Sequence, residues 1–231
     1  MSAQLRIDFV SDVACPWCAV GLYSLEEALR RTDGLVDATL TFRPFELNPE
    51  MAQAGVNHHE HIAGKFGMSV EQLGSSSHML RERAAAVGFA INSTPSSRIY
   101  NTFDAHRLLH WARSGKQQEL KHALLKANFT DNRDVSNHEE LVAIAASVGL
   151  DADEARRVLA SDLYASEVRA EEKLWMSRGI HAVPGIVINE KWLISGGQPA
   201  EYFEQALRDI AAALAIEDKK KPARPLSVPG R

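Results

Sequence analysis

Hydrophobic and polar positions near the N-terminus predict a strand, a helix and a second strand. Residues 5–10 form a short apolar run typical of a buried strand, and residues 18–31 carry apolar side chains at helical spacing. Residues 38–43 alternate between apolar and polar side chains, which predicts a strand that Pro44 ends. The chain therefore begins with a strand-helix-strand unit.

The middle of the chain has a helical period. From about residue 58 to residue 178, apolar positions recur three and four residues apart, and glycines stand where helices are expected to end. The expected helices lie within residues 70–87 and at residues 102–114, 117–129, 137–148, 151–161 and 164–178.

Strand character returns near the C-terminus. Residues 185–189 and 192–195 are β-prone, and the two residues between them fit a hairpin turn. Pro199 suits the first turn of a helix that is expected to run to about residue 216. The remaining residues are rich in lysine and proline, so we expect a disordered tail.

This order of elements predicts an α/β protein with a thioredoxin-like fold and a large all-helical insertion between its β-α-β and β-β-α halves. We expect the N-terminal half at residues 1–55 and the insertion at residues 56–178. The C-terminal half is expected at residues 179–216, and the tail at residues 217–231.

The only two cysteines of the chain form the motif Cys15-Pro16-Trp17-Cys18, placed between the first strand and the first helix. Such a pair can close into a disulfide and reopen, and a helix N-terminus favours the thiolate. We expect Cys15 to be the exposed attacking thiol and Cys18 to be the buried resolving thiol. Pro16 would fix the first helical turn, and Trp17 would offer an apolar surface beside the sulfur.

Two other interpretations of nearby residues were weighed. The cysteine pair could be half of a zinc site, but no second pair exists and His58, His59 and His61 are better explained as a solvated helix start, so we expect no metal. Asp8 could be a buried carboxylate that assists Cys18, but an edge or solvent-facing position is the stronger expectation.

Composition narrows the function classes. The 231 residues carry a net charge of −4, which does not favour nucleic acid as a partner. No run reaches the roughly 18 apolar residues that a membrane span needs. The N-terminus lacks the basic and apolar segments of a secretory signal, so a cytoplasmic protein is expected.

A second signature lies at residues 182–185, just before the predicted C-terminal hairpin. In thioredoxin-like architectures a cis-proline lies opposite the cysteine pair, and Val183-Pro184 occupies that place. The backbone of Val183 would then pair with an extended substrate chain.

With both signatures in place, the chain resembles the DsbA family of thioredoxin-fold oxidoreductases, in particular its FrnE-like branch. That branch is close to the 2-hydroxychromene-2-carboxylate isomerases and the kappa-class glutathione transferases. The segments that carry the resemblance are residues 12–18, 45–49, 101–108, 179–184 and 194–199.

The resemblance implies thiol-disulfide exchange or isomerisation through the cysteine pair, on protein or small-molecule thiols and disulfides. The isomerase and kappa branches have Ser where Cys15 stands, so the resemblance favours an oxidoreductase over an isomerase or a transferase. The alternative is a glutathione-dependent isomerase or transferase acting on a small aromatic molecule. A third interpretation is a redox-sensing partner protein.

The kappa-class resemblance also implies a homodimer and glutathione as a co-substrate, with no other cofactor required. Glutathione would contact Val183 and Pro184, together with Gly197 and Gln198 ahead of the last helix. Further candidates for lining the cleft are Asn48, Asn101, Asp104 and His106. A rigid corner explains Asn48 equally well, and helix capping with a polar core pair explains Asn101 and Asp104 equally well. For His106 a structural role is the stronger expectation.

Overall fold

A four-stranded sheet lies at the centre of the computed structural model, which describes residues 2–52, 54–94 and 96–220. The strand order is β2 (Val36–Pro44), β1 (Ala3–Ser11), β5 (Gly185–Ile188) and β6 (Trp192–Ser195). β1 is parallel to β2 and antiparallel to β5, and β5 and β6 form the hairpin. This is the predicted thioredoxin-like sheet.

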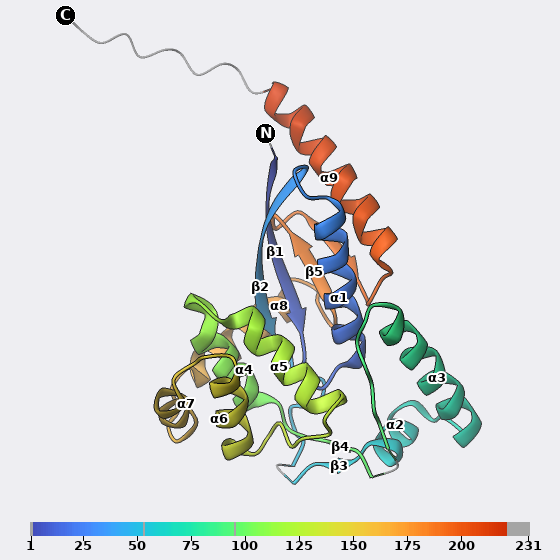
Figure 1. Ribbon diagram of the computed structural model, residues 1–231, viewed down its shortest axis with the longest axis vertical. Helices are drawn as coiled ribbons and strands as arrows, with labels where there is room; N and C mark the ends of the chain where they lie inside the picture. Colours follow the sequence, from blue (N-terminus) through green and yellow to red (C-terminus); the bar gives the residue numbers. More distant parts are fainter. Residues whose placement is uncertain (1, 53, 95, 221–231) are drawn as a thin grey trace, which may run out of the picture.

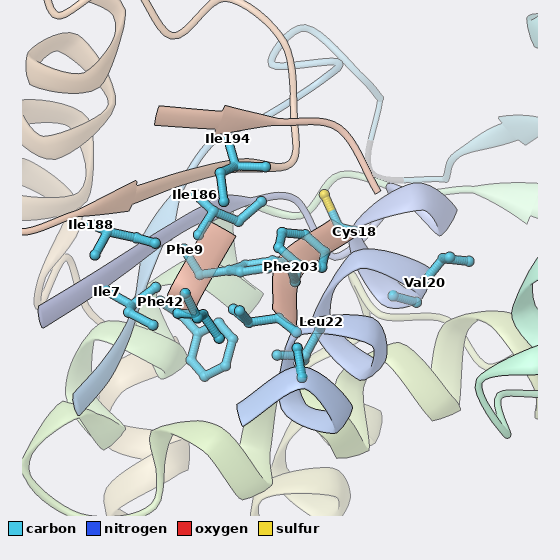
Figure 2. Packing of buried hydrophobic residues seen from close by; sticks show 14 of the residues in the cluster. Ile7, Phe9, Cys18, Val20, Leu22, Phe42, Ile186, Ile188, Ile194 and Phe203 are labelled. Atoms are coloured by element: carbon cyan, nitrogen blue, oxygen red, sulfur yellow. The ribbon is translucent and has the colours of Figure 1, made fainter. Parts of the chain in front are cut away.

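Alternation along β1 divides the sheet into two faces. Leu5, Ile7 and Phe9 point to the face covered by α1 (Pro16–Arg31) and α9 (Ala200–Lys220), and all are at most 2% exposed. Figure 2 shows Phe9 among Leu22 of α1 and Phe203 of α9. Val10 points to the other face, where it packs with Trp175 of α8 (Ala165–Ser177). Burial on this scale is the main stabilising contribution to the fold.

The insertion occupies the end of the sheet at which β1 leads into α1 (Figure 1). Its helices α4 (Phe103–Trp111), α5 (Gln117–Phe129), α6 (His138–Ser147) and α7 (Ala152–Leu159) share a second apolar core. The short helix η1 (Ala112–Ser114) joins α4 to α5. α5 has its predicted bounds, and the bounds of the other three helices differ from the predicted ones by one to three residues.

The insertion also contains elements that the sequence pattern did not predict. Two short strands, β3 (Val56–Asn57) and β4 (Arg98–Ile99), form an antiparallel pair. They bracket α2 (His58–Phe66) and α3 (Val70–Ala86), the latter within its predicted range. Strands of two residues carry too short a pattern to be detected by alternation.

Two predicted boundaries are corrected by the structure. The first helix begins at Pro16 rather than at residue 18, because proline is well suited to the first helical position. The last helix continues through residue 220, so residues 217–220 are helical rather than part of a disordered tail. Residues 221–231 lie outside the described residues. Within the described chain, no helix has the length and apolar character of a membrane span.

Candidate active site

The cysteine pair lies at the N-terminus of α1. Cys15 is the N-cap residue, with an extended backbone, and Pro16 occupies the first helical turn. The carbonyl of Cys15 accepts hydrogen bonds from the amides of Cys18 (3.0 Å) and Ala19 (3.4 Å). A thiolate on Cys15 would therefore face the positive end of the helix dipole.

Both thiols are free and both are buried. Cys18 is 0% exposed, deeper than Cys15, as predicted. Cys15 was expected to be exposed, but only 4% of its surface is accessible. The cause is the Val183–Pro184 segment, whose peptide bond is cis and whose Val183 carbonyl oxygen lies 3.7 Å from Cys15 Sγ. Two segments far apart in the sequence thus meet at the reactive sulfur.

The environment of Cys18 favours the thiol over the thiolate. Burial raises the pKa of Cys18 well above its ordinary value, and the adjacent Cys15 raises it further. Lys121 of α5 and the backbone amide of Asp12 act in the opposite direction. Cys18 therefore needs help from a neighbouring group to become a nucleophile.

Asp12 connects the cysteine loop to the insertion. Its carboxylate accepts hydrogen bonds from the Ala14 amide (3.1 Å), the Thr102 hydroxyl (2.8 Å) and the Leu47 amide (2.7 Å). His106 Nε2 lies 3.5 Å from the same carboxylate. Burial raises the pKa of Asp12, but His106 and the two amides outweigh burial and hold it below the usual value. The side chain of Asp12 is 1% exposed.

The buried carboxylate near Cys18 is thus Asp12, not Asp8. Asp8 points to the opposite face of the sheet from Phe9, and its carboxylate is paired with Arg43 at 2.7 Å. It is also neither an edge nor a solvent-facing residue, because its side chain is 13% exposed. β1 is a central strand, paired on both sides, so both of its faces are covered.

Close packing fixes α1 against the two loops at its end. A Cβ added to Gly21 would meet Pro184 Cγ at 3.1 Å and Gly197 Cα at 3.2 Å. A Cβ added to Gly197 would lie only 2.7 Å from the Trp17 carbonyl oxygen. Gly197 is therefore beside the cysteine motif, and two glycines permit this approach.

A cavity of about 440 Å³ opens beside the cis-proline. Val183, Pro184 and Leu193 are among its lining residues, and Leu193 is 52% exposed. Val183 also supplies the carbonyl oxygen that lies 3.7 Å from Cys15 Sγ, so this residue connects the cavity to the reactive sulfur. The volume is in the range of ordinary small-molecule sites.

The other residues predicted to line the cleft make hydrogen bonds or ion pairs with other parts of the protein. Asn48 accepts a hydrogen bond from Lys65 at 2.8 Å, and Gln198 donates to the Ser195 carbonyl at 2.9 Å. Asp104 binds Arg107 and His138, each at 2.7 Å, and Asn101 contacts the Met51 carbonyl and the Phe103 amide. His106, 2% exposed, contacts Asp12 and the Phe45 carbonyl, so it lies in the layer beneath the cysteines.

The histidine cluster is less solvated than predicted. His58 is half-buried, and both burial and the neighbouring His59 and His61 lower its pKa. His61 is within hydrogen-bond distance of Asn48 Oδ1 at 3.1 Å. Across residues 2–52, 54–94 and 96–220, no group of three or more His, Cys, Asp or Glu side chains is arranged to hold a metal ion.

Sequence reasoning missed Asp12 and Lys121. Asp12 is three residues before Cys15, a spacing that places it in the same loop, and this signal was available. Lys121 lies on the apolar side of its helix, between Leu120 and Leu124, whereas Lys126 lies on the opposite, exposed side. This signal was available in the periodicity, but a lysine is ordinarily expected at a solvent-exposed position.

Fold and site together define a thioredoxin-fold protein with a dithiol opposite a cis-proline. The family profile described as DSBA-like thioredoxin domain matches residues 6–208, so the chain belongs to this family. The resemblance found in the sequence is confirmed.

Solved structures agree on the fold. The chain is similar to a probable DsbA oxidoreductase from Streptomyces coelicolor, with 37% identity, coverage of 98% of this chain and 100% of that one, and a TM-score of 0.84. A 2-hydroxychromene-2-carboxylate isomerase is 15% identical, with 92% and 98% covered and a TM-score of 0.65. The cytosolic disulfide reductase DsbM from Pseudomonas aeruginosa, solved with GSH, is 18% identical, with 94% and 100% covered and a TM-score of 0.55. At these identities the last two show the fold alone.

Proposed function

We propose that this protein is a thiol-disulfide oxidoreductase that exchanges electrons with thiols and disulfides through Cys15 and Cys18. The observation that carries the proposal is the position of Cys15 Sγ at the N-terminus of α1, 3.7 Å from the Val183 carbonyl beside the cavity. A substrate chain in the cavity would pair with the Val183 backbone and present its disulfide to Cys15.

The reaction follows from this arrangement. The Cys15 thiolate attacks a substrate disulfide, one substrate sulfur leaves as a thiolate, and a mixed disulfide forms. Cys18 then attacks Cys15 Sγ, the bond to the substrate breaks, and the second substrate sulfur leaves. The substrate has gained two electrons and the protein holds a Cys15–Cys18 disulfide. The reverse sequence oxidises a dithiol substrate.

Glutathione-dependent chemistry on a small aromatic molecule is the second candidate. Two observations favour it: a largely apolar cavity of small-molecule size, and the fold shared with an isomerase and with a reductase solved with GSH. In this reaction Cys15 would position the glutathione sulfur and Cys18 would contribute little.

Equilibration in glutathione redox buffers, followed by alkylation and mass spectrometry, tests the proposal. We expect a two-electron equilibrium between dithiol and disulfide with little stable glutathione adduct. A persistent adduct on Cys15, or no internal disulfide at any redox poise, would favour the second candidate instead.

Single-cysteine variants sharpen the test, because the chain has no third cysteine. Cys18→Ser should accumulate a mixed disulfide on Cys15 and lose dithiol turnover by on the order of 1000-fold. Cys15→Ser leaves only Cys18, which is 0% exposed and should resist alkylation in the native state. Equal turnover by Cys18→Ser and the parent protein would contradict a resolving role.

A further inference from the structure

Lys121 is a buried lysine without a hydrogen-bond partner. Its residue is 0% exposed, and Nζ contacts no hydrogen-bonding atom of the protein. A buried ammonium in this state is unfavourable by several kcal/mol, and lysine is among the residues least often found fully buried. The position would be more stable with an apolar side chain, which indicates that the amine serves another purpose.

The helix that carries Lys121 is held firmly against the sheet. Gln117, one turn earlier on α5, donates to the Phe42 carbonyl and accepts from the Phe42 amide, each at 3.0 Å. The ammonium of Lys121 lies 6.0 Å from the centre of the Phe42 ring. Phe42 in turn packs edge-on against Phe9 at 5.8 Å. Phe9, Phe42 and Cys18 belong to one apolar cluster, so the amine is fixed at the border of the core that contains Cys18.

The electrostatic neighbours of Lys121 are the groups of the redox site. Cys18, Asp12 and Cys15 all interact with its charge, with Cys18 the strongest. In a buried, apolar environment such interactions are much stronger than in water. Burial lowers the pKa of Lys121, and the three acidic groups oppose that shift.

Several further basic side chains line the small cavity next to Lys121. They come from β2, α4 and η1, the elements that pack on this side of α5, and are Arg43, His106, His110 and Arg113. Glu171 of α8 accepts hydrogen bonds from Arg113 at 2.6 and 2.9 Å, and this pairing neutralises one of the cations.

We propose that Lys121 is a positioning residue for the resolving step, whose amine gains a proton as Cys18 loses one, so that its ammonium stabilises the buried Cys18 thiolate. This inference rests on the proposed function. During resolution the Cys18 thiolate attacks Cys15 Sγ, the Cys15–substrate bond breaks, and the substrate leaves as a thiolate. The protein retains the Cys18 proton on Lys121, which releases it once the Cys15–Cys18 disulfide has formed.

Stopped-flow reaction of the reduced protein with dithiobis(nitrobenzoate) separates the two steps. The first release of the coloured thiolate reports attack by Cys15, and the second reports resolution by Cys18. For Lys121→Met we expect the first phase within about twofold of the parent and the second slower by about 100-fold, the effect of losing a proton-accepting group. The pH midpoint of the second phase should rise.

Matched variants distinguish this role from a structural one. Lys126→Met removes the same charge from the same helix at an exposed position paired with Asp131, and should leave both phases unchanged. Lys121→Arg keeps a positive charge but cannot accept a proton, so its second phase should remain slow, whereas a purely structural need for a long basic side chain would be met by arginine. If Lys121→Met fails to fold, Lys121→Gln and the pH profile of the parent protein test the same inference.

The outcomes separate the two proposals. An unchanged second phase in a folded Lys121→Met protein would show that Lys121 is not used, while the proposed function would stand. Absence of the first phase in the parent protein would overturn the proposed function itself, and the inference on Lys121 with it.

Discussion

The contacts of the central sheet with α1 and α9 differ in kind from its contacts with the insertion. Toward α1 and α9 the contacts are apolar, with Ile7, Phe9 and Phe203 all at most 1% exposed (Figure 2). Toward the insertion, charged groups form much of the contact. We call this second region the seam and define it by Asp8, Asp12, Arg43, Glu46, Gln117, Lys121, Arg169, Glu171 and Glu172.

The difference explains what each region specifies. Apolar packing requires the correct volume and pattern, and many sequences satisfy it. Hydrogen-bonded charges are directional, and removing one partner leaves the other unsatisfied. The apolar face therefore stabilises the thioredoxin half, whereas the seam fixes how the insertion is oriented over the cysteine pair.

The largest effect is expected in the apolar face. Phe9→Ala should lower the free energy of unfolding by about 4 kcal/mol, because it opens a cavity beneath Phe42. The loss should be the same at all pH values between the acid and alkaline limits of folding. Chemical denaturation measures it, and Phe66→Ala, at a residue 64% exposed, is the control that should change little.

The next effect is expected at the seam. Asp12→Ala should lower the free energy of unfolding by about 3 kcal/mol, because it leaves the Leu47 amide and the Thr102 hydroxyl without an acceptor. The pKa of Asp12 is held below its ordinary value of 3.8, so the contribution is present above that pH and is lost as the pH falls through the native value. If the loss of unfolding free energy in Asp12→Ala does not change with pH, the contribution of Asp12 is not electrostatic.

Glu46 should show the opposite dependence on pH. Its side chain is 2% exposed, and burial and then Glu172 raise its pKa from 4.5 to about 7, against the attraction of Arg169. The native state thus binds the proton more tightly, so stability falls as the pH rises from 4.5 to about 7.

Glu46→Gln should therefore flatten this slope. The full shift is worth about 3 kcal/mol, and loss of the ion pair with Arg169 reduces the expected gain at alkaline pH to about 2 kcal/mol. At pH values below 4.5 the variant and the parent should be equally stable. Denaturation curves at several pH values measure the gain, and an unchanged slope would contradict the assignment.

The smallest effect concerns the close approach at the cysteine motif. Gly197→Ala should cost about 1–2 kcal/mol, because its Cβ would lie 2.7 Å from the Trp17 carbonyl oxygen and force α1 to move. Gly115→Ala is the matched control, since a Cβ there meets no atom within 4 Å. If thermal unfolding shows equal stability for the two variants, the loop that carries Gly197 moves to accommodate the Cβ, and α1 keeps its position.

Sequence patterns predicted the apolar face far better than the seam. The four strands of the central sheet and most helices follow from periodicity, and the cysteine pair and Val183–Pro184 follow from their place in that order. Asp8 was expected at an edge or facing solvent, and its burial was missed because the pattern does not show that both faces of β1 are covered. Lys121 was missed because a lysine is ordinarily expected to be exposed, even though the period of its helix places it on the apolar side.

The pairing of β1 with β5 has a consequence for synthesis on the ribosome. Ile7 is paired with Ile188, so the second neighbour of β1 is made only after the whole insertion has emerged. A nascent chain that ends before β5 has an open strand edge beside two thiols, without the Val183 segment that covers Cys15. Such long-range pairing slows folding. Until the final hairpin has been synthesised, the two cysteines of the incomplete chain are accessible to oxidation by other disulfides.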